Sequence, residues 1–155
     1  MRTGVRLGID VGTARIGVAR TDPAGMFASA FETVQRSSGD DSQDLDRILQ
    51  IANQTEAIEL VVGLPLSMSG SPSASTADAV QFAERLARQT AVPVRLVDER
   101  LSTVSATAQL HASGKKTRSH RPVIDQVAAV ILLQHALDAE RSGRLIGQLV
   151  ERSTD

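Results

Sequence analysis

Four acidic residues occupy positions from which a metal site can be built. Asp10 ends the first apolar strand, Asp98 and Glu99 end a later one, and Asp125 lies in the first turns of the last long helix. The carboxyl ends of parallel strands share one edge of a sheet, so three carboxylates could converge there. Converging carboxylates repel, and a divalent cation would offset that penalty. Oxygen donors in a chain without cysteine favour Mg²⁺ or Mn²⁺, and a few carboxylates plus substrate phosphates are a common magnesium site.

Each of these acids taken alone also has an ordinary structural interpretation. An aspartate at a strand end is often a turn residue, Asp125 could favour the helix dipole, and Glu99 could pair with Arg100. Asp10 is the exception, because the apolar residues around it indicate a central strand, where an aspartate is out of place. Adjacent side chains on a strand point to opposite faces, so we expect only one of Asp98 and Glu99 to join Asp10.

A short basic segment, residues 115–121, precedes the helix that carries Asp125. It stands between Gly114 and Pro122, which predicts a loop. A basic loop beside a metal site that takes substrate phosphates is suited to holding a nucleic-acid backbone, and a solvated loop without function is the alternative. The cations of this segment are Lys115, Lys116, Arg118 and Arg121.

The overall composition does not indicate a strongly basic nucleic-acid-binding protein. The formal net charge is −1, and the chain has no tryptophan, no tyrosine and three phenylalanines. Stacking of bases on aromatic side chains therefore cannot supply much of the affinity for a nucleic acid. Contacts to phosphates would have to supply it instead.

Hydrophobic periodicity predicts the elements that hold these residues. Three strands with short turns come first, and helices then alternate with two more strands. We therefore expect an α/β fold with one mixed five-stranded sheet, three antiparallel strands followed by two parallel ones, flanked by helices. The predicted strands are residues 5–10, 16–19, 26–34, 58–63 and 94–98, and the predicted helices lie around residues 45–52, 79–86 and 103–112 and from Pro122 onward.

The length of 155 residues suits a single domain, 1–155, with a peripheral tail after about residue 143. The 41% hydrophobic and 23% charged residues are typical of a globular protein. No apolar run is long enough to span a bilayer and no signal peptide is visible. Together with the absence of cysteine, this leads us to expect a soluble cytoplasmic protein that does not bind membranes.

Four motifs in order resemble those of the YqgF/RuvX family, a group of Holliday-junction resolvases and pre-ribosomal-RNA nucleases. The first is LGIDVGTARIGVA at residues 7–19, and the second is VGLP at residues 62–65, followed by Gly70. The third is VDERLST at residues 97–103, and the fourth is Ile124-Asp125 with apolar pairs at 128–129 and 131–132. They cover the chain from Arg6 to about Leu137.

The resemblance implies a ribonuclease H-like fold and a metal-dependent nuclease. Its catalytic, metal-binding acids would be Asp10, Glu99 and Asp125, and Asp98 could share or replace the role of Glu99.

The chain departs from the usual family pattern at two positions. Ala14 stands where a lysine is common, and Gln126 stands where a serine is common. Loss of that lysine would weaken phosphate contact, for which Arg15 could compensate.

The resemblance alone favours a two-metal-ion endonuclease that trims the 5′ end of pre-16S rRNA in ribosome biogenesis, as a monomer or homodimer. A Holliday-junction resolvase acting on branched DNA in recombination and repair is the alternative. Two hypotheses of another class remain. One is a non-catalytic ribosome-assembly factor. The other is a nucleotide-binding module, because residues 10–13 resemble the phosphate loop of actin-like kinases; that hypothesis requires a second such loop, which the sequence lacks.

Overall fold

The structure is a computed structural model that describes residues 2–38, 41–67, 69–100 and 121–151, although the side chains of residues 121–125 are not described. The predicted helix at 103–112 therefore lies outside the described residues. The elements are β1 (Arg6–Val11), β2 (Arg15–Thr21), β3 (Ala28–Gln35), α1 (Gln43–Thr55), β4 (Glu59–Leu64), α2 (Ala74–Gln89), β5 (Val94–Asp98), α4 (Arg121–Arg141) and β6 (Gln148–Leu149).

One mixed sheet organises the fold, with strand order β3-β2-β1-β4-β5-β6. The first three strands are antiparallel, and β1, β4 and β5 are parallel, as expected. The expected count of five strands is wrong, because β6 pairs with β5 in antiparallel fashion and makes a sixth. Both residues of β6 are exposed, so no buried–exposed alternation marks this strand in the sequence.

The third strand begins two residues later than predicted. The carboxylate of Asp22 accepts hydrogen bonds from the backbone N–H groups of Met26 and Phe27, at 2.9 and 2.8 Å. These bonds hold both residues in the turn that precedes β3, so the strand starts at Ala28.

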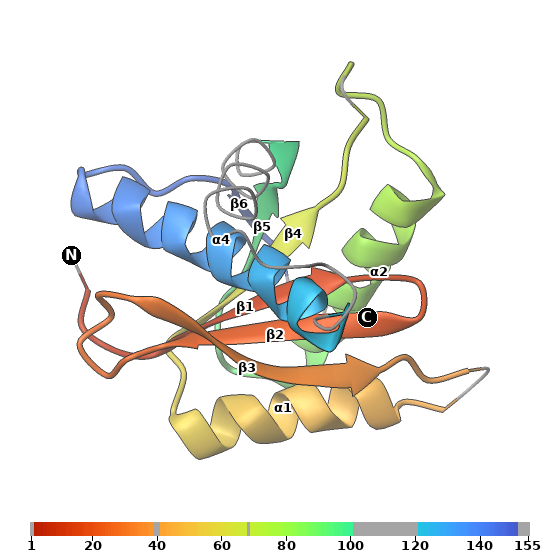
Figure 1. The fold of residues 1–155 in the computed structure, drawn as a ribbon, viewed down its shortest axis with the longest axis horizontal. Coiled ribbons are helices and arrows are strands. Elements are labelled where there is room, and N and C mark those ends of the chain that lie inside the picture. Colours follow the sequence, from red (N-terminus) through yellow and green to blue (C-terminus); the bar gives the residue numbers. More distant parts are fainter. Residues whose placement is uncertain (1, 39–40, 68, 101–120, 152–155) are drawn as a thin grey trace.

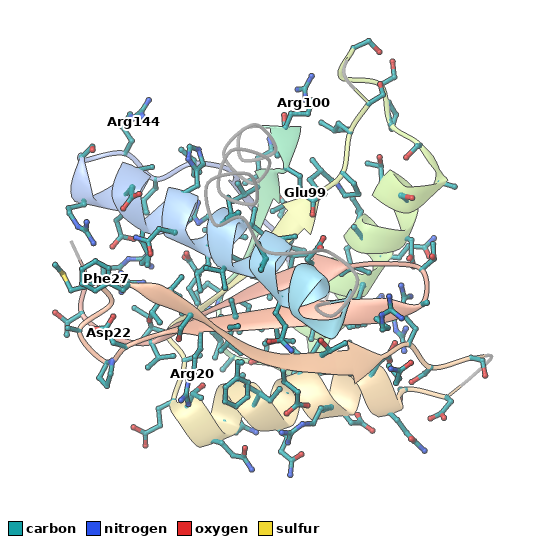
Figure 2. The ribbon with its side chains drawn as sticks, viewed as in Figure 1. Arg20, Asp22, Phe27, Glu99, Arg100 and Arg144 are labelled. Carbon is teal, nitrogen blue, oxygen red and sulfur yellow. The ribbon has the colours of Figure 1, made fainter. Side chains whose placement is uncertain are left out.

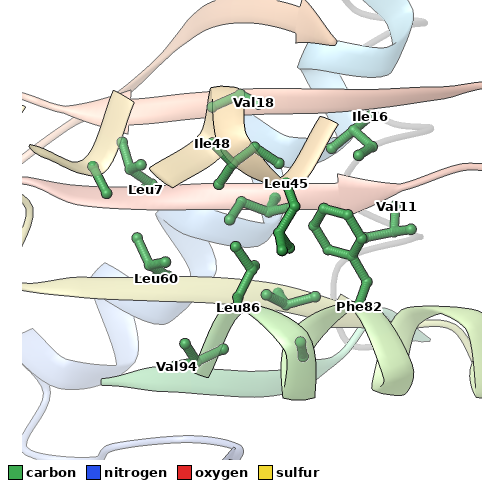
Figure 3. Packing of buried hydrophobic residues seen from close by; sticks show 14 of the residues in the cluster. Leu7, Val11, Ile16, Val18, Leu45, Ile48, Leu60, Phe82, Leu86 and Val94 are labelled. Carbon is green, nitrogen blue, oxygen red and sulfur yellow. The ribbon is translucent and has the colours of Figure 1, made fainter. Parts of the chain in front are cut away.

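Helices cover both faces of the sheet (Figure 1). On one face, α1 and α2 bury their apolar stripes at helical spacing, with Leu45 and Ile48 from α1 and Phe82 and Leu86 from α2. Figure 3 shows these side chains packed against strand residues such as Leu60. The resulting core joins α1 and α2 to the whole parallel part of the sheet.

The other face of the sheet is covered by α4, which is buried along most of its apolar length. Ala129, Leu132 and Leu133 form a second core cluster with Val61 of β4 and Val97 of β5. The contact with β1 is closest at one glycine: a Cβ at Gly8 would lie 2.8 Å from the carbonyl oxygen of Ala129 and 2.8 Å from the Cβ of Leu133.

Strand alternation then fixes the direction of Asp10. Leu7, Ile9 and Val11 belong to the core on the α1 and α2 side, whereas Gly8 contacts α4. Asp10 stands two residues after Gly8, so it faces the same side of the sheet as α4.

We predict that Gly8→Ala lowers the free energy of unfolding by about 1–3 kcal/mol, because the added methyl group meets the α4 backbone and α4 must shift. Urea denaturation measures this change. Ser29→Ala, at an exposed position of β3, is the control and should change stability by less than about 0.5 kcal/mol. Equal stability of Gly8→Ala and the wild type would contradict the close packing of α4 on β1.

Candidate active site

Two of the predicted acids, Asp10 and Glu99, meet at the edge of the sheet where the parallel strands β1, β4 and β5 have their carboxyl ends. Val61 and Val97 lie in the core under α4, and Gly63 and Glu99 stand two residues after them. Alternation therefore puts Gly63 and Glu99 on the same face as Asp10, and Asp98 on the opposite face. Figure 2 shows Glu99 at this edge, with Arg100 beside it.

The side chains of Asp10 and Glu99 are joined by a hydrogen bond. Burial, the hydrogen bond to Asp10 and the charges of Asp10 and Asp98 together raise the pKa of Glu99 from 4.5 to about 8, and burial is the largest of these causes. Without a cation, the Glu99 carboxyl therefore keeps its proton at neutral pH and donates a hydrogen bond to Asp10.

Gly63 makes this pairing possible. A Cβ at position 63 would lie 2.2 Å from Oε1 of Glu99 and 2.8 Å from its Cγ and Cδ, so any other residue would displace the carboxyl group. Glu99 is also fixed through its backbone, because its N–H donates to the Leu64 carbonyl at 3.1 Å and extends the β4–β5 ladder.

The carboxylate of Asp98 is paired with Arg100. Nε of Arg100 donates to Oδ1 and Oδ2 of Asp98 at 3.1 and 3.0 Å, and Nη2 donates to Oδ2 at 2.6 Å. The side-chain hydrogen bond from Arg100 holds the pKa of Asp98 below its usual range. The structure thus brings Glu99, and not Asp98, to Asp10, and the ion pair of Arg100 is with Asp98 instead of Glu99.

The register of α4 sets the position of Asp125. Ala129 packs on Gly8, and Asp125 precedes Ala129 by four residues on the same helix face. Four helical residues span about 6 Å, and the two-residue step from Gly8 to Asp10 spans about 6.6 Å. Because Glu140, near the other end of α4, pairs with Arg6 at the start of β1, the helix runs opposite to β1, and position 125 comes abreast of Asp10.

Sequence reasoning missed Arg36, which follows β3 and holds the turn after Asp10. Its Nη1 donates to the Gly12 carbonyl at 2.8 Å and to Oδ2 of Asp78 at 2.7 Å, and its Nε donates to Asp44 at 3.3 Å. One guanidinium therefore ties the β1–β2 turn to α1 and α2. The two acids stand in separate helices, so no local sequence pattern indicates the cluster.

The predicted nucleic-acid contacts fall mostly outside the described residues. Lys115, Lys116 and Arg118 lie there, and Arg121 begins α4 but its side chain is not described. Arg15 is exposed at the start of β2, and its carbonyl accepts a hydrogen bond from the Gly12 N–H at 2.9 Å. Gln126 donates to the Thr33 hydroxyl at 3.0 Å and so links α4 to β3.

The donor set fits a hard divalent cation. Asp10 and Glu99 offer carboxylate oxygens at one place, and the raised pKa of Glu99 reflects the desolvation and repulsion that a cation would relieve. Among the side chains that the structure describes, no group of three or more acidic, histidine or cysteine residues could hold a metal ion. A third ligand from this edge would have to come from outside that set.

A model of the family described as "RuvX: Holliday junction resolvase" matches residues 4–139. The chain belongs to this family. A relative from Clavibacter michiganensis is 58% identical over 154 residues, covering 99% of this chain and 95% of the relative. One from Leifsonia xyli is 59% identical over 142 residues, covering 92% and 90%. Both carry the name "Putative pre-16S rRNA nuclease".

A solved structure shares this fold. Thermus thermophilus RuvC in complex with a Holliday junction substrate superposes with a TM-score of 0.61, covering 94% of this chain and 99% of RuvC, at 18% identity. At that identity the likeness shows the fold alone, and it confirms the ribonuclease H-like architecture. Within the described residues, no helix has the length and apolar character needed to cross a bilayer.

We predict that, in metal-free protein, the carboxyl group of Glu99 titrates near pH 8 in ¹³C NMR spectra. The pKa of Glu99 is higher in the folded chain than in the unfolded one, so the folded state keeps the proton across the interval between the two values. This group therefore lowers the free energy of unfolding as pH rises from about 4.5 to about 8. Glu99→Gln should remove that part of the slope in denaturation experiments.

Gly63→Ala is the matched variant for this titration. It should push the Glu99 carboxyl away from Asp10 and lower its pKa while the fold persists, because the clash is with the mobile end of a side chain. Titration of wild-type Glu99 near pH 4.5 would contradict the pairing with Asp10.

Proposed function

We propose that this chain is a metal-dependent phosphodiester endonuclease in which Asp10, Glu99 and Asp125 hold Mg²⁺ or Mn²⁺. The observation that carries the proposal is the pairing of the Asp10 and Glu99 carboxyl groups at the edge of the sheet where α4 begins. Family membership supports it, since the family is described by a nuclease activity. When bound, two such ions would activate a water and stabilise the leaving oxygen of the phosphodiester.

The residues of the chain have distinct tasks in this proposal. Asp10 and Glu99 would hold the metal through their carboxylate oxygens, for which Glu99 would have to be deprotonated. Gly63 leaves room for Glu99 above β4, and Arg36 holds the turn that follows Asp10. The packing of α4 on Gly8 keeps position 125 at the site.

For the substrate, we propose the 5′ end of pre-16S rRNA in cytoplasmic ribosome biogenesis. Relatives at 58% and 59% identity carry that name, whereas the solved complex with a Holliday junction is 18% identical. A four-way DNA junction is the second candidate, supported by the family description. In either case we propose that the substrate backbone is held by Arg15, Lys115, Lys116, Arg118 and Arg121.

The deciding experiment incubates the purified protein with Mg²⁺ or Mn²⁺ and either a pre-16S rRNA fragment or a four-way DNA junction. Defined cleavage of the RNA and none of the junction would support rRNA processing, and the reverse would support the junction. Cleavage of neither, by protein shown to be folded, would overturn the nuclease proposal.

We predict that Asp10→Asn abolishes metal-dependent cleavage and leaves the fold intact. The charge that binds the cation is lost, whereas the side chain keeps its size. Because repulsion at the sheet edge is also relieved, the free energy of unfolding without metal should be unchanged or slightly higher. Cleavage rates and denaturation curves measure both effects, and wild-type cleavage by the variant would refute this catalytic role.

We also predict that Glu99→Gln weakens Mn²⁺ binding much more than Asp98→Asn does. Glu99 lies against Asp10, and Asp98 lies on the other face, bound to Arg100. Calorimetric titration of the two variants with Mn²⁺ makes a matched comparison, since each exchanges one carboxylate for an amide. A larger loss for Asp98→Asn would reverse the assignment of the ligands.

A further inference from the structure

Arg100 follows Glu99 directly and projects from the same edge of the sheet (Figure 2). Its guanidinium is held side-on by Asp98, which accepts hydrogen bonds from Nε and Nη2. Asp98 also accepts a hydrogen bond from the backbone N–H of Arg100, at 2.9 Å, so the two residues form a closed local unit. The direction of the guanidinium is therefore fixed before any ligand arrives.

Nη1 is the remaining nitrogen of this guanidinium. Nη1 of Arg100 donates no hydrogen bond to any residue that the structure describes, and the Arg100 side chain is 35% exposed. Gly70, in the loop after β4, has φ +87°, and a Cβ there would lie 3.2 Å from Nη1. The absence of a side chain at position 70 thus keeps the outer side of the guanidinium open.

Stability gives little reason for this arrangement. An ion pair that is partly exposed contributes about 0–1 kcal/mol, and here it joins residues only two positions apart. A guanidinium whose Nε and Nη2 are fixed by a carboxylate, and whose outer side faces solvent beside a site for phosphodiester cleavage, is suited to an anion. Phosphate oxygens are the acceptors that arginine binds in paired, charge-assisted hydrogen bonds.

We propose that Arg100, oriented by Asp98, binds a backbone phosphate of the nucleic acid that flanks the phosphodiester cleaved at Asp10 and Glu99. This inference rests on the proposed nuclease function. It assigns Asp98 to positioning Arg100, because both of its carboxylate oxygens already accept hydrogen bonds from that residue. In this proposal Asp98 contributes to substrate binding, and Glu99 contributes to metal binding.

The test measures binding of a fluorescent pre-16S rRNA fragment in EDTA over a range of salt concentrations, so that cleavage does not intervene. Arg100→Gln should weaken binding about tenfold and reduce the salt slope by about one unit, as loss of one phosphate contact requires. Its Mn²⁺ affinity should equal that of the wild type. Arg144→Gln, which removes an exposed arginine beyond the end of α4, is the matched control and should leave binding and slope unchanged.

A double-mutant cycle tests the role of Asp98. Asp98→Ala should raise KM with little change in kcat and keep the salt slope, because the charge of Arg100 remains but its direction is lost. Combined with Arg100→Gln, it should add no further loss, since the two residues act as one unit. Additive losses would show that Asp98 acts independently of Arg100 and would overturn its positioning role.

The outcomes separate this inference from the proposed function. If the wild type cleaves the RNA while Arg100→Gln binds it with wild-type affinity and salt slope, the phosphate contact is wrong and the nuclease stands. If binding depends on Arg100 but neither RNA nor junction is cleaved with metal, the contact stands and the nuclease proposal fails. A wild type that binds neither nucleic acid would overturn both.

Discussion

Two carboxyl groups, one in β1 and the other on the residue that follows β5, share a hydrogen bond across the end of β4, although β1 and β5 are not neighbouring strands. Adjacent strands lie about 4.8 Å apart, so Asp10 and Glu99 must reach toward each other over roughly 10 Å of sheet. That is possible only if the intervening strand presents no side chain at this point, and β4 presents Gly63 there. The cost is a desolvated pair of acids, visible in the raised pKa of Glu99, and the rest of the fold has to keep that pair together.

The opposite end of α4 supplies part of that rigidity. Arg6 at the start of β1 is buried and donates to Glu140 of α4 at 2.6 Å, and Arg95 of β5 pairs with the buried Glu59 of β4 at 3.4 Å. Arg2 contacts both of these acids. Buried ion pairs add little net stability, because desolvation offsets their attraction, but removing one partner is costly. Their effect here is to fix where α4 lies along β1, and with the contact at Gly8 this determines which residue of α4 comes abreast of Asp10.

Much of this arrangement could be predicted from local patterns, and the remainder depends on contacts between distant segments. Asp10 is recognisable because an acid interrupts an apolar strand. Strand alternation predicts that only one of Asp98 and Glu99 reaches Asp10, and the family resemblance selects Glu99. Arg36 could not be recognised, because its partners are brought together only when α1 and α2 pack on the same face. The role of Gly63 could not be predicted either, because it depends on the side chain of Glu99, 36 positions later in the chain. The strand β6 was not predicted because its two exposed residues leave no periodic pattern in the sequence.

The end of β5 shows how much one residue step decides. Asp98, Glu99 and Arg100 are consecutive, yet alternation sends Glu99 to the face with Asp10 and leaves Asp98 on the other face, where Arg100 donates to both of its oxygens. If the register of β5 slipped by one residue, Asp98 would replace Glu99 above Gly63, with a side chain one methylene shorter and with Arg100 no longer held. The Gly63↔Val97 pairing prevents this slip, because it places Val97 in the core under α4. The apolar core therefore selects which of two adjacent acids meets Asp10, and so links the packing of α4 to the chemistry proposed for this edge.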